Sequence, residues 1–256
     1  MKRSIKSLIG YSLRETDGEV GKVDQFYFDD ETWTIRYLVV QTGNWLSGRK
    51  VLISPKVLQE PDWVREEFPV NLTQEQIRNS PDIDTKKTVS RLHEEQISSP
   101  EEFWGSESYA HGAGIFGLMP SDLAEEIAEN ETIDETEAKQ PPESIHLRST
   151  EEITGYTIHA TDGEIGKVVD FIIDDSTWEI KFLVVETGSW LNSRKVLLFT
   201  RWIKEVNWEN SLVIVDLSME AIKNSPEFDA SEPVNEVYER KLYDYYGRPQ
   251  NEEVES

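Results

Sequence analysis

The sequence predicts a mainly β protein: two small β-barrels in tandem, each with a short C-terminal helix. Three observations predict this class, namely an internal repeat, short segments of alternating apolar and polar residues, and tight-turn signals between these segments. The eight residues "TDGEVGKV" from Thr16 return as "TDGEIGKV" from Thr161. At the same offset of 145 positions, residues 10–52 give 26 identities in 43 aligned positions without a gap. The chain is therefore a tandem duplication.

The repeat defines the domain organisation. A unit of about 85–100 residues is an ordinary size for one small domain, so two copies indicate two globular modules and not a solenoid. We predict a first barrel with its tail helix over residues 1–105, a partly disordered or helical acidic linker over 106–147, and a second barrel with a Tyr-rich tail helix over 148–256. Of the eight Trp residues, six form pairs at the offset, which are Trp33/Trp178, Trp45/Trp190 and Trp63/Trp208.

The first two strands are predicted around a tight turn. The segment "SLIGYSLR" at residues 7–14 alternates and leads into Asp17-Gly18, a dipeptide that supplies positive φ in hairpin turns. The next strand covers residues 19–29, where Gly21 indicates a bulge or a close approach of another backbone segment.

Three further strands follow in each copy. After a polar turn at residues 29–32, "WTIRYLVVQT" has the two-residue period of a strand. A loop then leads into a fourth strand, and "EFPVNLT" in copy one or "SLVIVDL" in copy two forms the last. Five or six short strands with tight turns favour a small closed barrel, which leaves no free sheet edge.

Short helices are predicted after the last strand. Thr73 and Gln76 have the spacing of a capping box and start a helix that ends at Pro81. Further on, "VSRLHEEQI" from Val89 aligns with "VNEVYERKL" from Val234. In copy two the apolar residues recur at helical spacing, so we expect an amphipathic helix with an aromatic face on the barrel, ended by Gly247.

Composition and charge limit the classes of function. The chain has no Cys, which excludes disulfides, Cys–zinc sites and thiol catalysis. It shows no signal-peptide pattern and no apolar run of the roughly 18 residues needed to cross a bilayer, so we expect a soluble cytoplasmic protein. Its net charge of −24 disfavours direct nucleic-acid or anionic-lipid binding and leaves a basic protein partner open. Residues 1–100 are nearly neutral, at −2.

The segment "GYSLRETDGEVGKVDQFYFDDETWTIRYLVVQTG" and its second copy resemble the PRC-barrel module. The shared features are Gly10, the Asp17-Gly18 turn, Gly21-Lys22-Val23, the acidic turn at Asp29-Asp30, and the strand Leu38-Val39-Val40. The resemblance covers residues 5–105 and 150–249, and the tail segments look like those of stand-alone bacterial proteins with two such barrels. The module also resembles the cytoplasmic domain of the photosynthetic reaction-centre H subunit and the C-terminal domain of a ribosome-maturation factor.

We consider three hypotheses for function, of which the first is favoured by the absence of a convergent catalytic set and by the repeated Trp loops, and the other two are implied by the resemblance. The first is a non-enzymatic interaction or scaffolding protein without cofactor or metal. The second is an accessory protein of a membrane photosynthetic or electron-transfer complex, peripheral to the membrane, although this chain lacks the transmembrane helix of the H subunit. The third is a role in ribosome or RNA maturation through a basic protein partner. The two modules are also expected to associate as a pseudo-dimer within the chain, since duplicated units that once paired often stay paired, and a homo-oligomer stays open.

Three patterns suggest chemistry only weakly. The run "GAGIFG" at Gly112 has dinucleotide-loop spacing but lacks the surrounding βαβ unit, so we interpret it as linker glycine. The paired carboxylates Asp29/Asp30 and Asp174/Asp175 lack calcium-loop spacing and are typical of turns. None of the four histidines recurs in both copies, which argues against a catalytic or metal role; they are His93, His111, His146 and His159.

The candidate partner-binding residues lie in one loop of each copy. "NWLSGRK" and "SWLNSRK" combine a large aromatic residue with two cations, and Trp and Arg are enriched in binding hot spots. The alternative is that Trp closes the end of the barrel and the cations solvate the strand start. The Tyr-rich tail is likewise expected to pack on its own barrel or to dock another chain. The candidates are Trp45, Arg49, Lys50, Trp190, Arg194 and Lys195.

Overall fold

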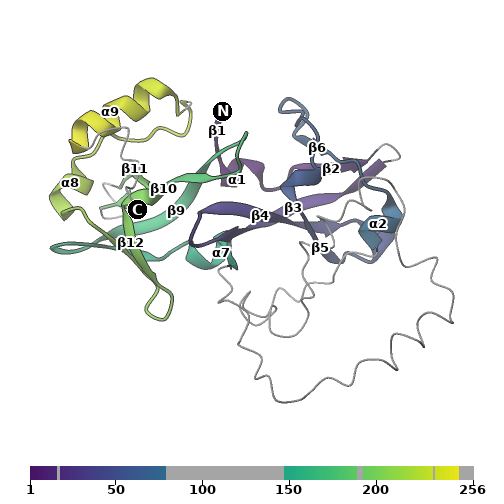
Figure 1. The fold of residues 1–256 in the computed structure, drawn as a ribbon, viewed down its shortest axis with the longest axis horizontal. Helices are drawn as coiled ribbons and strands as arrows, with labels where there is room; N and C mark the ends of the chain where they lie inside the picture. Colours follow the sequence, from purple (N-terminus) through teal and green to yellow (C-terminus); the bar gives the residue numbers. More distant parts are fainter. Residues whose placement is uncertain (16–17, 79–146, 189–192, 233, 248–256) are drawn as a thin grey trace, which may run out of the picture.

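The computed structural model describes residues 1–15, 18–78, 147–188, 193–232 and 234–247, and the fold within them is mainly β (Figure 1). Two separate sheets lie side by side along the long axis, one for each copy of the repeat. We call residues 1–78 module 1 and residues 147–247 module 2. The predicted boundaries at 105 and 106 fall outside the described residues and stay predictions, as does the tail helix of copy one.

Both modules follow a closely similar order of elements. Module 1 contains β1 (Lys2–Ser4), α1 (Ile5–Leu8), β2 (Ser12–Glu15), β3 (Gly18–Asp29), β4 (Thr34–Thr42), η1 (Asn44–Leu46), β5 (Lys50–Ile53), η2 (Pro55–Val57), β6 (Glu67–Pro69) and α2 (Gln74–Arg78). Module 2 contains β7 (Leu147–Ser149), α7 (Thr150–Ile153), β8 (Thr157–Ala160), β9 (Gly163–Asp174), β10 (Ile180–Thr187), β11 (Arg194–Phe199), η4 (Thr200–Trp202), β12 (Ile203–Asn207), β13 (Leu212–Val215), α8 (Met219–Lys223) and α9 (Glu236–Tyr246).

Each sheet bends back on itself. The strand order is β5-β4-β3-β2-β6 in module 1 and β11-β10-β9-β8-β13-β12 in module 2. The two end strands of the module 2 sheet, β11 and β12, are separated in the chain only by the three residues of η4, so the sheet must curl until its ends meet. Among the described residues no ladder joins the end strands of either sheet, so hydrogen bonding of a fully closed barrel is not seen there.

The first strand of each module pairs with the sheet of the other module. β1 runs antiparallel to β9, with Arg3 opposite Ile173, and β7 runs antiparallel to β3, with Arg148 opposite Phe28. These strands were not predicted, because three polar-rich residues carry no period. Their exchange joins the two copies through equivalent contacts, as expected for a pseudo-dimer.

The tips of two hairpins meet at the same junction. Trp33 and Trp178 both have positive φ, at 54° and 59°, which is rare for a bulky residue. This backbone turns each tip toward the other module: the Ile35 amide donates to the Trp178 carbonyl at 2.8 Å, and the Ile180 amide donates to the Trp33 carbonyl at 2.7 Å. The hairpin turns therefore hold the modules together.

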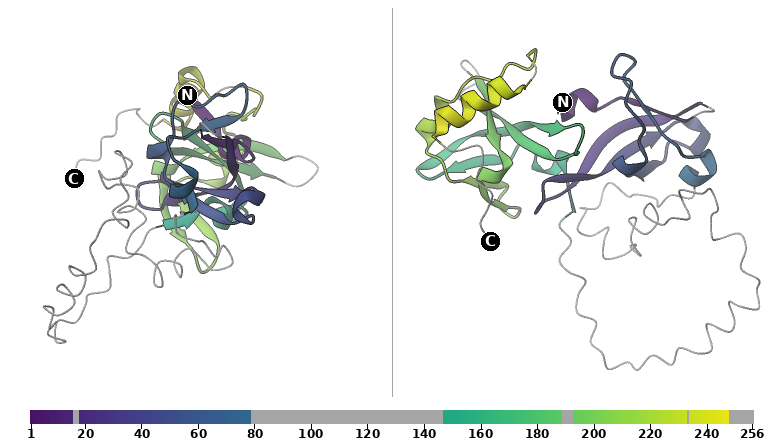
Figure 2. Two further views of the ribbon diagram at one scale, coloured as in Figure 1. Left: turned by 90° about the vertical axis from the view of Figure 1, so that its right-hand side faces the viewer. Right: turned by 45° about the horizontal axis from the view of Figure 1, so that its top comes forward.

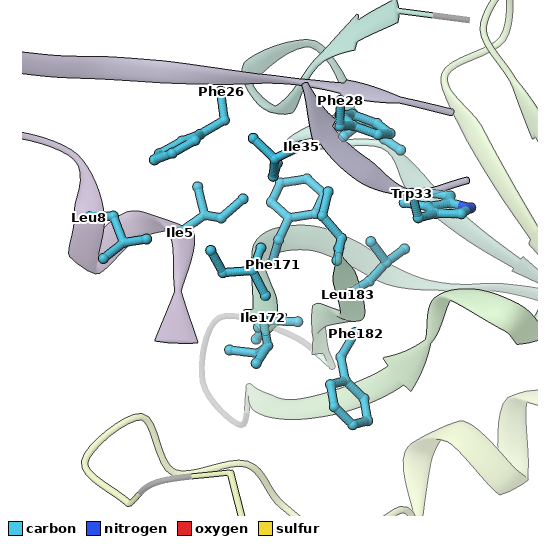
Figure 3. Close-up of a cluster of buried hydrophobic side chains, with 14 of the residues drawn as sticks. Ile5, Leu8, Phe26, Phe28, Trp33, Ile35, Phe171, Ile172, Phe182 and Leu183 are labelled. Carbon is cyan, nitrogen blue, oxygen red and sulfur yellow. The ribbon is translucent and has the colours of Figure 1, made fainter. Parts of the chain in front are cut away.

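Apolar side chains from both modules form one cluster across the junction (Figure 3). The ring centroids of Phe28 and Phe171 are 6.5 Å apart, although the residues belong to different copies. Phe171 is 1 % exposed, and Phe28 is fully buried. Burial of large apolar side chains is the main source of stability in such a core, so the two modules share part of it.

Local predictions were confirmed at two places. The capping box exists: the Thr73 amide donates to Gln76 Oε1 at 2.7 Å and the Gln76 amide to Thr73 Oγ1 at 3.3 Å. The close approach at Gly21 exists too, because a Cβ there would lie 2.3 Å from the carbonyl oxygen of Gln41.

One predicted strand was partly wrong. Residues 7–14 do not form one strand, since Ile5–Leu8 is a helical turn, α1, and only Ser12–Glu15 is extended. The reason is local: the Ser4 hydroxyl accepts from the Ser7 amide and starts the turn, and Gly10, with φ 89°, ends it.

The tail helix of module 2 packs on its own module, which was one of the two predicted alternatives. α9 crosses one face of the module 2 sheet (Figure 2) and buries Leu242 and Tyr243. Gly247 ends it, as predicted, and takes the left-handed conformation. None of the helices in the described part of the chain has the length and apolarity that a membrane span requires.

Candidate functional site: a groove on module 1

A groove of about 360 Å³ lies beside the junction, mainly on module 1. Strand β4 and η2 form its floor, and the hairpin turn of module 2 forms one wall. Its volume is at the lower end of the range of about 300–1,000 Å³ that is usual for ligand pockets. The lining residues are Thr34, Ile35, Arg36, Tyr37, Ser54, Pro55 and Lys56 of module 1, and Ser176, Thr177 and Trp178 of module 2.

The equivalent place on module 2 is filled by α9. At the offset of 145, Ser54 and Lys56 of the groove align with Phe199 and Arg201. The Tyr243 ring of α9 lies 4.6 Å from the Phe199 ring, and the Arg201 guanidinium lies 4.7 Å from the centre of the Tyr243 ring. A tilted aromatic contact and a cation–π contact thus hold α9 on this face of module 2. The equivalent face in the described part of module 1 is the groove.

Most hydroxyl groups of the groove are already engaged. Ser54 is 6 % exposed and caps η2, where its Oγ accepts from the Lys56 amide. The Ser176 hydroxyl donates to Asp174, and Thr34 Oγ1 donates to the Thr32 carbonyl. The groove therefore has few neutral polar groups left to offer a ligand.

Two cations define the electrostatics of the groove. The Lys56 side chain is exposed and forms no ion pair with any described residue. Arg36 donates to Asp29 Oδ2 at 3.0 Å. Burial alone would raise the pKa of Asp29, but hydrogen bonds from the Thr32 amide and Arg36 outweigh it and lower that pKa. Asp29 therefore stays ionised and neutralises part of the Arg36 charge, which leaves Lys56 as the stronger attractor for an anion.

The surroundings of Trp45 bear on its two predicted roles, partner binding and closure of the barrel end. Its ring is partly buried against the core, and its indole N–H donates to the Val20 carbonyl at 2.8 Å. A hydrogen-bond partner of this kind is usual for the indole N–H of a buried Trp. Trp190, its counterpart, lies outside the described residues.

Arg49 and Arg194 make the same contact in the two modules. Arg49 Nη1 donates to the Arg78 carbonyl at 3.0 Å, and Arg194 Nη1 donates to the Lys223 carbonyl at 3.1 Å. Both carbonyls end a short helix, α2 or α8, where cations are favourable. These contacts give the arginines a structural role, and their role in binding a partner stays a prediction.

The two lysines of the predicted loops differ. Lys50 forms an ion pair with Asp24 at 2.7 Å, whereas Lys195 is exposed. The five candidates that the structure describes do not line the groove. The groove residues were missed because no pattern within one copy marks them. A comparison of the two copies does mark them, since the aromatic Phe199 and Trp202 align with Ser54 and Val57.

The paired carboxylates serve the turns and the junction. Asp29 Oδ1 accepts from the Thr32 amide at 2.8 Å, and Asp174 Oδ1 accepts from the Ser176 amide at 3.0 Å, as expected for turn-forming Asp. Their neighbours bind arginines of the opposite module: Arg148 donates to Asp30 at 3.1 Å and Arg3 donates to Asp175 at 2.8 Å. The turn role was predicted, and the ion pairs across the junction were not.

The remaining patterns add no second site. His159 lies on β8, while His93, His111 and His146 and the glycine run at Gly112 fall outside the described residues. Among the described residues, no group of three or more His, Asp and Glu side chains converges as a metal site would need.

The comparisons with known proteins agree with the fold. A search of proteins with curated descriptions found none that matches this chain. The model of the PRC-barrel domain matches residues 2–66 and 148–221, which together are more than half of the chain. One matched segment lies within each module, so the chain belongs to the PRC-barrel domain family and contains two such domains in tandem.

Proposed function

We propose that this chain is a non-enzymatic protein-interaction or scaffolding protein, and that the groove of module 1 receives the partner. The observation that supports it is the difference between two homologous faces. The module 2 face binds a helix, α9, through Phe199 and Arg201, while the equivalent described face of module 1 is an open groove. A surface that binds a helix in one copy is a natural binding surface in the other.

The chemistry of the groove supports binding better than catalysis. Its carboxylate neighbour Asp29 is held ionised by Arg36 and by turn amides, so it is poorly placed to exchange protons near neutral pH. An exposed charged group of the groove is the Lys56 ammonium, which attracts an anion without activating it. A rim cation of this kind mainly increases association rate and specificity.

The positive charge within the groove favours a different kind of partner from the one that the net charge of the chain favours. The net charge of −24 favours a basic protein at long range. Within the groove, however, Lys56 and Arg36 act over distances shorter than the Debye length of about 8 Å at physiological salt, so they favour an acidic segment. We therefore propose a partner with an acidic binding segment.

Two further hypotheses follow from the family resemblance. An accessory protein of a membrane electron-transfer complex would co-fractionate with membranes and leave them at high salt. A ribosome-maturation protein would associate with ribosomal subunits at low salt through a basic ribosomal protein. Fractionation at two salt concentrations separates both from a scaffold that binds elsewhere.

A partner captured by cross-linking tests the proposal. The captured protein is purified, and its dissociation constant is measured for the wild-type chain, for Lys56→Glu and for the control Lys167→Glu, an exposed lysine on β9 away from the groove. We expect Lys56→Glu to weaken binding by up to about fivefold, since one exposed ion pair contributes up to about 1 kcal/mol. The proposal is wrong if both variants bind like the wild type.

A further inference from the structure

We infer that the module 1 groove recognises an amphipathic helix of a partner protein, whose aromatic ring fills the place that Tyr243 fills in module 2 and whose neighbouring acidic residue pairs with Lys56. This inference rests on the proposed function and adds the chemistry of the partner segment. The template is inside the chain, because α9 already occupies the homologous face.

The floor of the groove has room for a ring. In module 2 the space between β10 and η4 is filled by aromatic residues, since Phe199 lies 4.3 Å from Phe182 and 4.6 Å from Trp202 between ring centroids. In module 1 the aligned residues of this floor are Tyr37, Ser54 and Val57. Two large rings are thus replaced by small side chains, and a ring from outside has more space to enter.

Module 1 also has a cation at the position that lies over the Tyr243 ring in module 2. Arg201, which covers Tyr243, aligns with Lys56. Lys56 can therefore make the same cation–π contact, although Lys is a weaker partner for a ring than Arg. Because its ammonium is exposed, it can also pair with a carboxylate beside the ring, as Asp244 stands beside Tyr243 in α9.

One residue that contacts α9 has a different counterpart on the module 1 face, and this difference specifies the partner helix further. Glu239 of α9 forms an ion pair with Lys2 on β1. The equivalent of Lys2 on β7 is Leu147, an apolar side chain that packs on the core. The partner helix is therefore expected to carry an apolar residue four positions before its ring, where α9 has Glu239.

The corresponding segment of copy one fits these requirements poorly. It lies outside the described residues, so the comparison is of sequence alone. At the offset of 145, Glu239 aligns with Glu94, Tyr243 with Ser98 and Tyr246 with Glu101. At this offset the segment has Ser98 in place of the Tyr243 ring and a carboxylate where Leu147 favours an apolar residue, and its own aromatic residues Phe103 and Trp104 come three positions later than Tyr245 and Tyr246 do in copy two. This mismatch favours a partner protein as the occupant.

A peptide derived from α9 tests the inference on the full chain. The probe is a fluorescent synthetic peptide of residues 234–247 that carries Glu239→Leu. We expect it to bind the wild-type chain, to bind Lys56→Glu about fivefold more weakly, and to bind Lys167→Glu as it binds the wild type. A peptide that also carries Tyr243→Ala should lose most of its affinity. Circular dichroism and thermal unfolding of both protein variants confirm that they are folded.

Three results would overturn the inference. The first is no binding of the peptide, or equal binding of the Tyr243→Ala peptide. The second is equal binding to Lys56→Glu, which would place the peptide on module 2 in exchange with α9. The third is binding only after Leu92→Asp and Ile97→Asp are introduced in the copy-one segment, which would make that segment the occupant. If the captured partner still depends on Lys56 while the peptide does not bind, the proposed function stands and only the helix inference fails.

Discussion

Module 1 and module 2 share a sequence pattern and a fold but differ on one face. On module 2, α9 covers the floor formed by β10 and η4, and Tyr243 is buried beneath Arg201. On module 1 the equivalent floor, with Ser54 and Lys56, is a groove. Duplication thus supplies two copies of one face, and divergence at a few positions has made their surfaces different.

The junction differs from the outer faces, because the contacts that module 1 makes with module 2 are repeated by the equivalent residues of module 2 on module 1. Arg3 and Arg148 each bind an Asp of the other module, and Trp33 and Trp178 exchange backbone hydrogen bonds. Residues that hold the modules together have thus been retained while the outer faces changed. The comparison separates positions needed for assembly from positions free to acquire a binding role.

The largest effect is expected from the shared core. Phe171→Ala removes a ring that is 1 % exposed and contacts both modules, so we expect a loss of about 3–5 kcal/mol in the free energy of unfolding. Because the core is shared, urea denaturation followed by Trp fluorescence should show one transition that shifts as a whole. Two transitions, of which one stays in place, would mean that the modules are energetically independent.

The next largest effect distinguishes two aligned glycines. A Cβ at Gly21 or Gly166 would lie 2.3 Å from a backbone oxygen, of Gln41 or Glu186. Gly166 also has φ 74°, which penalises any side chain. We expect about 3 kcal/mol of destabilisation for either Gly→Ala variant, and more for Gly166→Ala. Thermal unfolding measures the order of the two, and a more stable Gly166→Ala variant would refute the backbone argument.

A smaller effect is expected at the ion pairs of the junction. Arg148→Met removes the contact with Asp30 and the cation over the Trp208 ring, 4.3 Å from its centre. Arg3→Met is its counterpart for Asp175 and Trp63. We expect about 1–3 kcal/mol for each, because hydrogen bonds to charged groups contribute in this range. A double-mutant cycle with Asp30→Asn should give a coupling energy for Arg148 and none for Arg3.

The smallest effect concerns pH. Burial raises the pKa of Tyr246 on α9 to about 12. The neutral phenol is therefore favoured in the folded state, and its contribution to stability is full below the unfolded pKa of about 10 and is lost as pH rises toward 12. Tyr246→Phe should flatten the fall in stability between pH 10 and 12, as measured by urea unfolding at fixed pH. An unchanged slope would show that Tyr246 ionises as readily in the folded chain as in the unfolded one.

The sequence predicted the parts of the fold that depend on neighbouring residues. The strand β4 followed from the alternation that begins at Trp33, and α2 followed from the capping box of Thr73 and Gln76. The exchanged strands β1 and β7 could not be predicted, since three residues have no measurable period and their partners lie about 120–170 positions away. The groove was missed for a related reason. Its residues form no recognisable pattern within one copy, and only the contacts that their counterparts make with α9 in module 2 mark this face as a binding surface.

The most direct test of the difference between the modules is the reactivity of Lys56 in the full chain. Lysines are modified with a small amine reagent, and the rate at each site is measured by mass spectrometry, with exposed Lys167 and Lys195 as references. If the groove is open, Lys56 reacts about as fast as these two, and addition of the partner slows it selectively. A rate an order of magnitude slower in the free chain would show that the chain itself covers the groove, and would contradict the account.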